Sequence, residues 1–398
     1  MDELIDFLKR EDVKQFIAEN VETDVNRLIL NPPTNFKERI KDIASQILSR
    51  QKAKGKLEDW ANNFDLIMPP PLSIEQASSK VTCEYKKLLV SGNHLVDLTG
   101  GMGVDFLALS DSFAQSTYVE KDPKLCSIFT HNAEVLGRNA KILTEEASDF
   151  LAKLDSSEKH IFFVDPARRD QNKSKVFKIE ECSPNIVELL PLLQGKAIKV
   201  LVKYSPLLDI QSIVKALPAI REIHIVSVKN ECKELLILID FDFEGDAEIR
   251  CMNLGSGHNP YSFYLDDEKV LKIELKYLDK YLFEPNSSIM KAGSFKKIAN
   301  DFEIDKLAEH THLYTKHVPV KGFPGRTFRV VDEADKKNIK QYARDGVINV
   351  ITRNYPISAS ELKKKWKLRD GGKFFLIAFR DKDEKPRMVI ADRFDPLI

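Results

Sequence analysis

The most informative residues of the chain form a glycine-rich turn in the run VDLTGGMGVD, positions 96–105. An apolar segment that reads as a strand ends at Asp97, and a helical pattern follows the glycines. Glycine lets the backbone approach a ligand closely, and the first turn of the next helix presents free N–H groups. In open parallel sheets, ligands bind at this carboxyl edge. The run predicts a small-molecule site with Thr99, Gly101 and Gly103 among its contacts.

Two classes of ligand use this geometry. Dinucleotide sites require a third glycine, in the pattern G-x-G-x-x-G, so that the helix packs closely beneath the pyrophosphate. Phe106 occupies that position here, and the carboxylate of Asp97 would repel a phosphate. S-adenosylmethionine has no pyrophosphate, and its amino group and sulfonium are cationic. The turn therefore favours S-adenosylmethionine, with an ordinary strand-to-helix turn as the alternative.

Acidic residues also follow the next two predicted strands. Glu120 lies 17 residues after Gly103, where an acid can accept hydrogen bonds from both hydroxyls of a ribose. After the third strand, either Glu146 or Asp149 could accept a hydrogen bond from the adenine amino group. Asp149 could equally cap the start of a helix. The sequence leaves this choice open.

The fourth strand end carries the residues that we expect to do chemistry. The run IFFVDPARRD at 161–170 is fully apolar and then turns polar at Asp165. Pro166 fixes a turn and removes a hydrogen-bond donor, which leaves carbonyl groups free. We expect Asp165 to position the target or accept its proton, while Arg168 and Arg169 hold a phosphate or a base edge.

In this order, the four segments resemble motifs I to IV of class I S-adenosylmethionine-dependent methyltransferases, over about residues 73–240. The positions that match the first three motifs are Asp97, Gly101, Gly103, Glu120 and the pair Glu146-Ala147. Asp165-Pro166 matches the start of the catalytic D-P-P-Y type motif. The resemblance implies a Rossmann-like sheet of seven strands and S-adenosylmethionine as the cofactor, with Asp165 close to it.

The fourth motif departs from the family pattern because it reads D-P-A-R. The aromatic residue that stacks on the target base in amino-group methyltransferases is missing, so the resemblance does not imply methylation of an exocyclic amino group. Methylation at carbon 5 of a pyrimidine requires a cysteine nucleophile. Ala167 stands where that cysteine often lies, and the nearest cysteine, Cys182, reads as a packing residue.

The D-P-A-R-R form resembles a bacterial group whose C-terminal domain is called THUMP-like, and true THUMP domains bind tRNA. The segments that carry this resemblance are residues 352–356, 363–367 and 370–372. Residues 321–398 hold 19 basic and 11 acidic side chains, whereas residues 69–320 have a net charge of −6. This basic segment indicates a polyanion, and we expect RNA, either tRNA or rRNA.

Basic side chains supply the expected RNA contacts. Lys364 and Lys365 lie on a predicted helix, and Arg353 precedes Tyr355, so phosphate binding and base stacking are both possible there. The alternative places Trp366 in the core and the lysines in water. Lys203, at the end of a further predicted strand, is expected to face the catalytic cleft.

The elements around these residues alternate between strands and helices. Apolar strands are expected at 94–98, 116–120, 160–165, 198–203, 222–227 and 234–241. Apolar strands separated by helices indicate a parallel sheet covered on both faces, which is an α/β fold. We expect four parts: an N-terminal helical region (1–70), the methyltransferase domain (71–245), a small α+β linking domain (246–320) and the basic α+β domain (321–398).

Several expectations concern finer elements and context. Within the linking domain we expect a strand at 270–274 and a helix at 294–302, and beyond it a βαβαββ unit with a helix at 334–344. The N-terminus is charged from its second residue, and no apolar run is long enough to span a bilayer. The five cysteines form no C-x-x-C pair, so we expect a reducing cytoplasmic location and no metal. The oligomeric state stays open.

Overall fold

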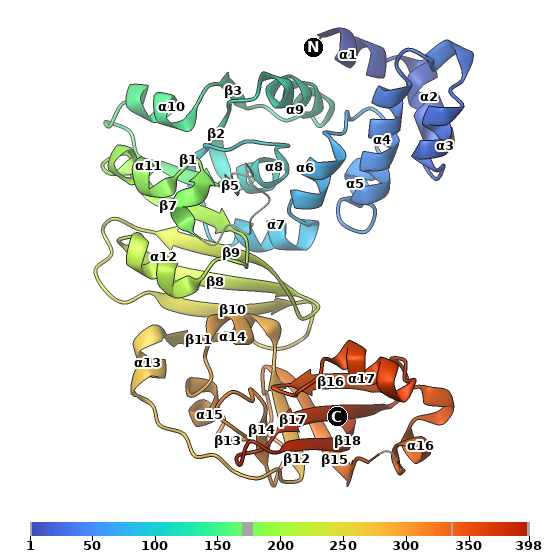
Figure 1. Cartoon of the computed structure of the whole chain (residues 1–398). Coiled ribbons are helices and arrows are strands. Elements are labelled where there is room, and N and C mark those ends of the chain that lie inside the picture. The colour runs from blue at the N-terminus through green and yellow to red at the C-terminus, as the bar shows by residue number, and fades with distance from the viewer. Residues whose placement is uncertain (1, 169–177, 336, 396–398) are drawn as a thin grey trace. The chain divides into compact units, whose positions relative to one another are not determined.

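The structure, a computed structural model, describes residues 2–168, 178–335 and 337–395 (Figure 1). Arg169 lies outside the described residues, and of Arg168 only the backbone is described. The chain forms two compact units. One comprises residues 1–221 with 236–245, and the other comprises 222–235 with 246–398.

Short helices occupy the N-terminal region, as the apolar spacing predicts. They are α1 (Asp2–Leu8), α2 (Glu11–Glu19), α3 (Val25–Leu30), the 3-10 helix η1 (Thr34–Phe36), α4 (Ile40–Ala53) and α5 (Glu58–Ala61). The apolar faces of α1 to α4 and η1 share one core that includes Val13, Ile43 and Ile47, whereas Ala61 of α5 belongs to a second cluster. The guanidinium of Arg50 is buried and donates to the carbonyls of Ala61, Asn63 and Leu66, which fixes the loop that leaves this region.

Parallel strands build the sheet of the first unit. They are β1 (Gly92–Asp97), β2 (Phe113–Glu120), β3 (Lys141–Thr144), β4 (His160–Val164) and β7 (Ala197–Tyr204), in the spatial order β3-β2-β1-β4-β7. Chain order reverses between β1 and β4, because β2 and β3 lie on one side of β1 and β4 lies on the other. Such a switch point is where ligands bind in open α/β sheets.

Helices lead into β1 and then connect the successive strands, since parallel pairing requires a crossover. In chain order they are α6 (Pro71–Gln76), α7 (Lys80–Lys87), α8 (Val104–Ser110), α9 (Pro123–Val135), α10 (Ala147–Lys153), η2 (Ile179–Glu181), α11 (Ile186–Leu193) and α12 (Ile210–Ala216). The short strands β5 (Ala167–Arg168) and β6 (Cys182–Ser183) pair separately as an antiparallel ribbon.

The same hydrogen-bonded sheet continues from β7 through β9 (Glu231–Ile239) and β8 (Ile220–Val228) to β10 (Glu248–Leu254) and β11 (Tyr261–Tyr264). Lys229 and Asn230 alone connect β8 to β9, and both have positive φ angles, 51° and 65°. A two-residue turn of this kind joins antiparallel strands. In spatial order, the strands β3, β2, β1, β4, β7, β9 and β8 are the seven expected from the resemblance. Strands β10 and β11 extend the described sheet to nine.

A seven-stranded sheet forms the C-terminal part of the second unit, in the order β13-β14-β12-β15-β18-β17-β16. Its strands are β12 (Tyr281–Pro285), β13 (Asp305–Lys306), β14 (Tyr314–Lys316), β15 (Gly325–Glu333), β16 (Asn349–Arg353), β17 (Phe374–Arg380) and β18 (Pro386–Phe394). Its helices are α13 (Leu265–Val270), α14 (Ser287–Ala292), α15 (Lys297–Asp301), α16 (Ile339–Tyr342), η3 (Arg344–Gly346) and α17 (Ala359–Trp366).

Alternating side chains of β17 place this sheet between two cores. Ile377 and Phe379 join one apolar cluster. Leu376 and Ala378 join the other, which also contains Leu362 of α17. The alternation follows from the two-residue repeat of a strand. Helix α17 therefore packs on one face of the sheet. The side of α17 that faces away from the sheet carries lysines.

Three sequence expectations need correction or adjustment. The strand expected at 270–274 is wrong, because α13 extends to Val270 and the following residues form no regular element. Its mixed pattern of apolar and charged residues fits an extended segment, which makes only the isolated bridge of Leu275 with Lys306. The helix expected at 334–344 is shorter, since α16 covers only Ile339–Tyr342, and the helix expected at 294–302 exists as α15 but covers only Lys297–Asp301. No described helix is long and apolar enough to cross a membrane.

Candidate functional site

A pocket of about 380 Å³ opens at the switch point, at the carboxyl ends of β1, β2, β4 and β7. The predicted site residues that line it are Asp97, Thr99, Gly101, Gly103, Glu120, Glu146, Asp165 and Lys203. They come from five separate segments of the chain. The fold therefore brings them together as the sequence analysis expects.

Glycines in the turn after β1 are required by close packing as well as by backbone geometry. A Cβ atom at Gly100 would lie 2.2 Å from the ring of Tyr118, and one at Gly103 would lie 2.2 Å from the ring of Phe129. The two rings stack with their centroids 4.0 Å apart, and the Tyr118 hydroxyl donates to the Gly101 carbonyl at 2.6 Å. The stacked rings of Tyr118 and Phe129 thus pack directly against the turn and fix its backbone.

Glu120 fixes the other side of the turn. One carboxylate oxygen accepts from the Gly101 N–H at 2.9 Å, and the other accepts from the Asp122 N–H at 2.9 Å. Each carboxylate oxygen has a second lone pair, so Glu120 can still accept from a ligand. Its position on the pocket wall suits a pair of vicinal hydroxyls.

Asp97 is buried at the floor of the pocket, 1% exposed. Its Oδ1 accepts from the N–H of Thr99 at 2.9 Å. Burial raises the pKa of Asp97 well above its usual range, and the charges of Asp105, Asp165 and Glu120 raise it further. A cation placed beside this carboxyl would recover the energy that burial costs its charged form.

Two lysines and two aspartates form a buried ion network next to the turn. Lys203 lies 2.8 Å from Asp105 and 2.6 Å from Asp165, measured between Nζ and the nearest carboxylate oxygen. Lys86 reaches the other oxygen of Asp105 at 3.0 Å, and its side chain is fully buried. Ser78 completes the network, because its Oγ lies 3.0 Å from both Nζ atoms and 2.8 Å from Asp105. The Asp165 side chain is 37% exposed and faces the pocket.

The network fixes the ionisation of Asp105. Burial alone would raise the pKa of this carboxyl, but the charges of Lys203 and Lys86 outweigh burial and hold the pKa far below its usual range. Asp105 is therefore a carboxylate at any physiological pH. It anchors Lys203, which in turn holds Asp165 at the pocket rim.

Lys203 faces the cleft, as expected from the sequence, whereas its partners Ser78, Lys86 and Asp105 were not predicted. A signal for Lys86 exists, because it lies on the same helical face as Thr82 and Cys83, which pack inward in α7. A lysine on an inward face needs a buried carboxylate. Asp105 follows directly after the glycine turn, but only the folded chain brings α7 against α8.

A hydroxyl connects the ends of the two central strands. Thr99 Oγ1 accepts from the Asp165 N–H at 2.7 Å, so the turn after β1 and the turn after β4 are joined directly. Pro166 is buried and does not line the pocket, whereas Ala167 does. Cys182 is 2% exposed and also does not line it.

The two candidates for the adenine contact differ in position. Glu146 lines the pocket, and its carboxylate lies 3.6 Å from Lys121. Asp149 is exposed on α10 and does not line the pocket. Glu145, beside Glu146, is paired with Lys153 at 2.6 Å.

The C-terminal basic residues divide into two groups. Arg353 pairs with the buried carboxylate of Glu284 at 2.5 Å, and Arg326 pairs with the same carboxylate. Lys364 and Lys365 are exposed on α17. Trp366 and Tyr355 pack against the core cluster beneath that helix. Trp366 therefore packs on the core, which was the alternative expectation, and the side chains of Lys364 and Lys365 face solvent.

The raised pKa of Asp97 predicts a pH-dependent stability. The folded state retains a proton on Asp97 that the unfolded chain releases above about pH 4. The free energy of unfolding should therefore fall as pH rises toward the raised pKa, by up to about 1.4 kcal/mol per pH unit. Asp97→Asn preserves the Oδ1 acceptor for Thr99 and removes this dependence. Urea unfolding of both proteins at several pH values measures the difference, and parallel pH profiles would contradict a raised pKa.

Comparison with known proteins gives two family matches. Residues 281–324 match a family described as a ferredoxin-like domain, and residues 325–393 match one described as THUMP domain-like. A search of curated proteins gives no match.

Among solved structures, the chain is similar to a candidate methyltransferase from Porphyromonas gingivalis W83. The identity is 29% over 96% of this chain and 98% of that one, and the TM-score is 0.85. Weaker matches are the candidate methyltransferase yhhF from Escherichia coli (21% identity, 40% of this chain and 84% of that one, TM-score 0.29) and a candidate rRNA-methylase from Clostridium thermocellum (12%, 40% and 94%, TM-score 0.30). The chain thus has a methyltransferase fold, followed by ferredoxin-like and THUMP-like regions.

Proposed function

We propose that this protein transfers a methyl group from S-adenosylmethionine to a base in RNA, either tRNA or rRNA. The observation that carries the proposal is the junction of two strand ends in one pocket. A hydrogen bond joins the glycine turn after β1 to the turn after β4: the Asp165 N–H donates to Thr99 Oγ1 at 2.7 Å. A cofactor seated against the turn would present its reactive carbon to Asp165.

The residues of the pocket fit this cofactor. The volume of about 380 Å³ lies within the usual range for small-molecule sites. Glu120 would accept from the ribose hydroxyls, Glu146 from the adenine amino group, and Asp97 would face the cationic amino-acid tail. When bound, the cofactor supplies a methyl group that its sulfonium has already activated. The chain's own task is therefore placement of the target and exclusion of water.

Asp165 is the residue that we assign to the target base. Lys203 fixes its position through the 2.6 Å ion pair, and more than a third of its side chain remains accessible. In this arrangement Asp165 would orient the base or take up its proton during transfer. Arg168 and Arg169, which follow Asp165 by three and four positions in the sequence, would hold a flanking phosphate.

RNA is the favoured substrate because of the C-terminal region. It matches a THUMP-like family over residues 325–393, and residues 321–398 carry a net charge of +8. Lys364 and Lys365 project their charges into solvent, as phosphate contacts require. A methyltransferase for a protein or a small molecule would not need this charge, and a non-catalytic RNA-binding protein would not need the pocket.

The cofactor assignment predicts the behaviour of Gly101→Val. A Cβ atom at Gly101 meets only the Thr99 carbonyl, at 3.6 Å, so the valine side chain would project into the pocket and block the ligand. We expect calorimetry to show that the affinity for S-adenosylmethionine falls about 100-fold or more. A steric clash that costs about 3 kcal/mol of binding free energy has this effect.

Gly137→Val is the matched control for this variant. Gly137 also has a positive φ of 62° with nothing within 4 Å of its Cβ position, but it lies outside the pocket. Both variants carry the same backbone strain, of order 1–2 kcal/mol. Equal cofactor affinity in the two variants would contradict the assignment of the turn.

The assignment of Asp165 predicts a separation of binding from catalysis. In Asp165→Asn, Lys203 retains Asp105 and Ser78 as partners, so the fold and cofactor binding should persist. Methyl transfer should fall about 100-fold, the scale of a lost general base. The measurement is transfer of labelled methyl groups to total cellular RNA. Asp149→Asn, which changes an exposed carboxyl outside the pocket, should leave the rate unchanged.

The basic C-terminal region predicts salt-dependent RNA binding. Each phosphate contact on a single strand contributes a slope of about −0.7 to the plot of log affinity against log salt. Lys364→Glu with Lys365→Glu should therefore flatten the slope by about 1.4. Lys37→Glu with Lys41→Glu is the control, because these lysines are also exposed but lie in the N-terminal region. The proposal fails if the two pairs behave alike.

The decisive experiment identifies the product. Mass spectrometry of RNA nucleosides from a strain lacking the gene and from its parent should reveal one missing methylated nucleoside, and the Asp165→Asn variant should not restore it. Full restoration by that variant would indicate that the pocket acts without this carboxylate. An unchanged nucleoside profile, with intact cofactor binding, would favour a protein or small-molecule substrate.

A further inference from the structure

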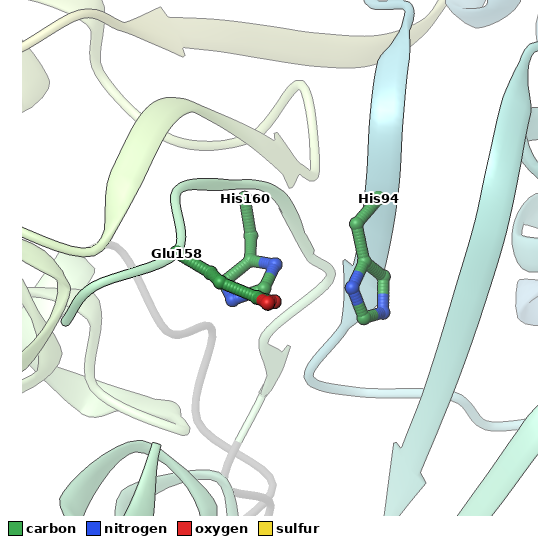
Figure 2. Close-up of side chains that lie close together, drawn as sticks. All are labelled: His94, Glu158 and His160. Atoms are coloured by element: carbon green, nitrogen blue, oxygen red, sulfur yellow. The ribbon is translucent and has the colours of Figure 1, made fainter. Parts of the chain in front are cut away.

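A second cluster of potential ligand groups lies at the amino ends of the strands, opposite the pocket edge of the sheet. His94 is near the start of β1, His160 is the first residue of β4, and Glu158 lies in the loop before β4. One ligand atom from each residue lies within 4.8 Å of the others. In Figure 2 the two imidazoles and the carboxylate converge on one space. None of the three lines the pocket described above.

The sheet register accounts for this meeting of distant residues. β1 and β4 are hydrogen-bonded neighbours, and Leu95 is paired with Ile161, so the residues before them lie side by side. His94 and His160 point to the same face, since side chains of aligned positions in neighbouring strands do. Their rings lie 4.7 Å apart at 88°. No metal was expected from the sequence, because no cysteine or histidine cluster has zinc spacing, and these two histidines are 66 residues apart.

His160 is the feature that ordinary packing does not explain. Its side chain is 2% exposed, and neither ring nitrogen has a hydrogen-bond partner among the described residues. Buried polar groups in proteins are nearly always paired, so two unpaired nitrogens on one buried ring require a reason. A metal ion is a partner of the right kind, because neutral imidazole is a preferred ligand of zinc.

His94 shows the arrangement typical of a metal-binding histidine. Its Nε2 lies 2.9 Å from the hydroxyl of Thr117 on β2, which is itself buried. That bond orients the ring and leaves Nδ1 directed toward His160 and Glu158, as Figure 2 shows. Histidine ligands characteristically use one nitrogen for the metal and give the other to an orienting partner.

We propose that His94, His160 and Glu158 bind a divalent zinc ion at the amino edge of the sheet. Zinc commonly takes two histidines and one carboxylate, with water in the fourth position. Ligand atoms at 2.0–2.1 Å from a tetrahedral ion lie roughly 3.3 Å apart, so the cluster must contract by about 1.5 Å. Glu158 is exposed and can move by this amount, and it also provides the route of entry from solvent.

Electrostatics supports a cation at this position. The site around the buried His160 ring disfavours a positive charge on the imidazole itself, and neutral imidazole is the form that binds a metal. Glu158 contributes a negative charge. The positive charge of Lys141 would oppose a cation here, but its electrostatic interaction with His94 is weaker than that of Glu158. The inference is independent of the proposed methyl transfer, because it uses none of the pocket residues.

Zinc binding by the full-length protein, after removal of metal with a chelator, tests the proposal. Titration with zinc chloride should show one equivalent bound. Glu158→Gln keeps the size of an exposed side chain, so it should fold normally while its zinc affinity falls at least about tenfold. Thr117→Val should weaken binding by roughly 10–100-fold without removing a ligand, the range for loss of an orienting partner.

His317→Asn is the matched control, because His317 also pairs with a carboxylate, Asp279 at 3.1 Å, but on an exposed surface. It should bind zinc as the unchanged protein does. Substituting cobalt for zinc should give the visible absorption of a tetrahedral site, and Glu158→Gln should abolish that absorption. The proposal is overturned if no zinc binds, if Glu158→Gln binds it with unchanged affinity, or if His317→Asn loses it.

Discussion

Charge balance around Asp105 is the constraint on which the rest of the site depends. Two lysines approach this one buried carboxylate, and Asp165 supplies the second negative charge, so the four side chains are neutral as a set. Removing Lys86 or Asp105, the buried members, would leave an uncompensated charge in a dry environment, which costs several kcal/mol, whereas Asp165 at the rim stays accessible to water. The requirement joins α7, α8, β7 and the turn after β4. It therefore makes the helix before the sheet part of the site, although that helix offers no recognisable motif.

The pocket itself is acidic, and this sets the kind of ligand that it suits. Asp97, Glu120, Glu146 and Asp165 all line it, with Lys203 occupied by two of the nearby carboxylates. Mutual repulsion contributes to the raised pKa of Asp97, after burial. A phosphate-bearing cofactor would add to the repulsion, whereas a ligand with cationic groups would relieve it. The same electrostatics that disfavours a dinucleotide thus supports the proposal of S-adenosylmethionine. If the substrate is RNA, as proposed, most of its phosphates would have to be bound outside this pocket, which agrees with the basic charge of residues 321–398.

Local patterns predicted most of the fold, and non-local contacts account for what they missed. Apolar runs identify β1, β2, β4, β7, β8 and β9, because each signal lies within a few residues, whereas the short strands β5 and β6 have no such signal. The strand expected at 270–274 failed, because an apolar residue at every second position also fits an extended connection. Arg353 appeared available for phosphate, but Glu284, 69 residues away, neutralises it. Lys86, and the pairing of His94 with His160, likewise depend on which elements become neighbours.

The two central strands are joined more firmly than sheet hydrogen bonds alone require. At their carboxyl ends, Thr99 accepts from the Asp165 backbone, and this bond sets the separation of the two turns. At their amino ends, the proposed zinc ion would connect His94 to His160. Thr99 follows His94 by five positions, a distance of only about 17 Å along an extended chain. A rigid connection over so short a span would hold Asp97 and Asp165 in fixed register while neighbouring loops move. Methyl transfer depends on placement more than on proton chemistry, so such rigidity would act on the rate through geometry.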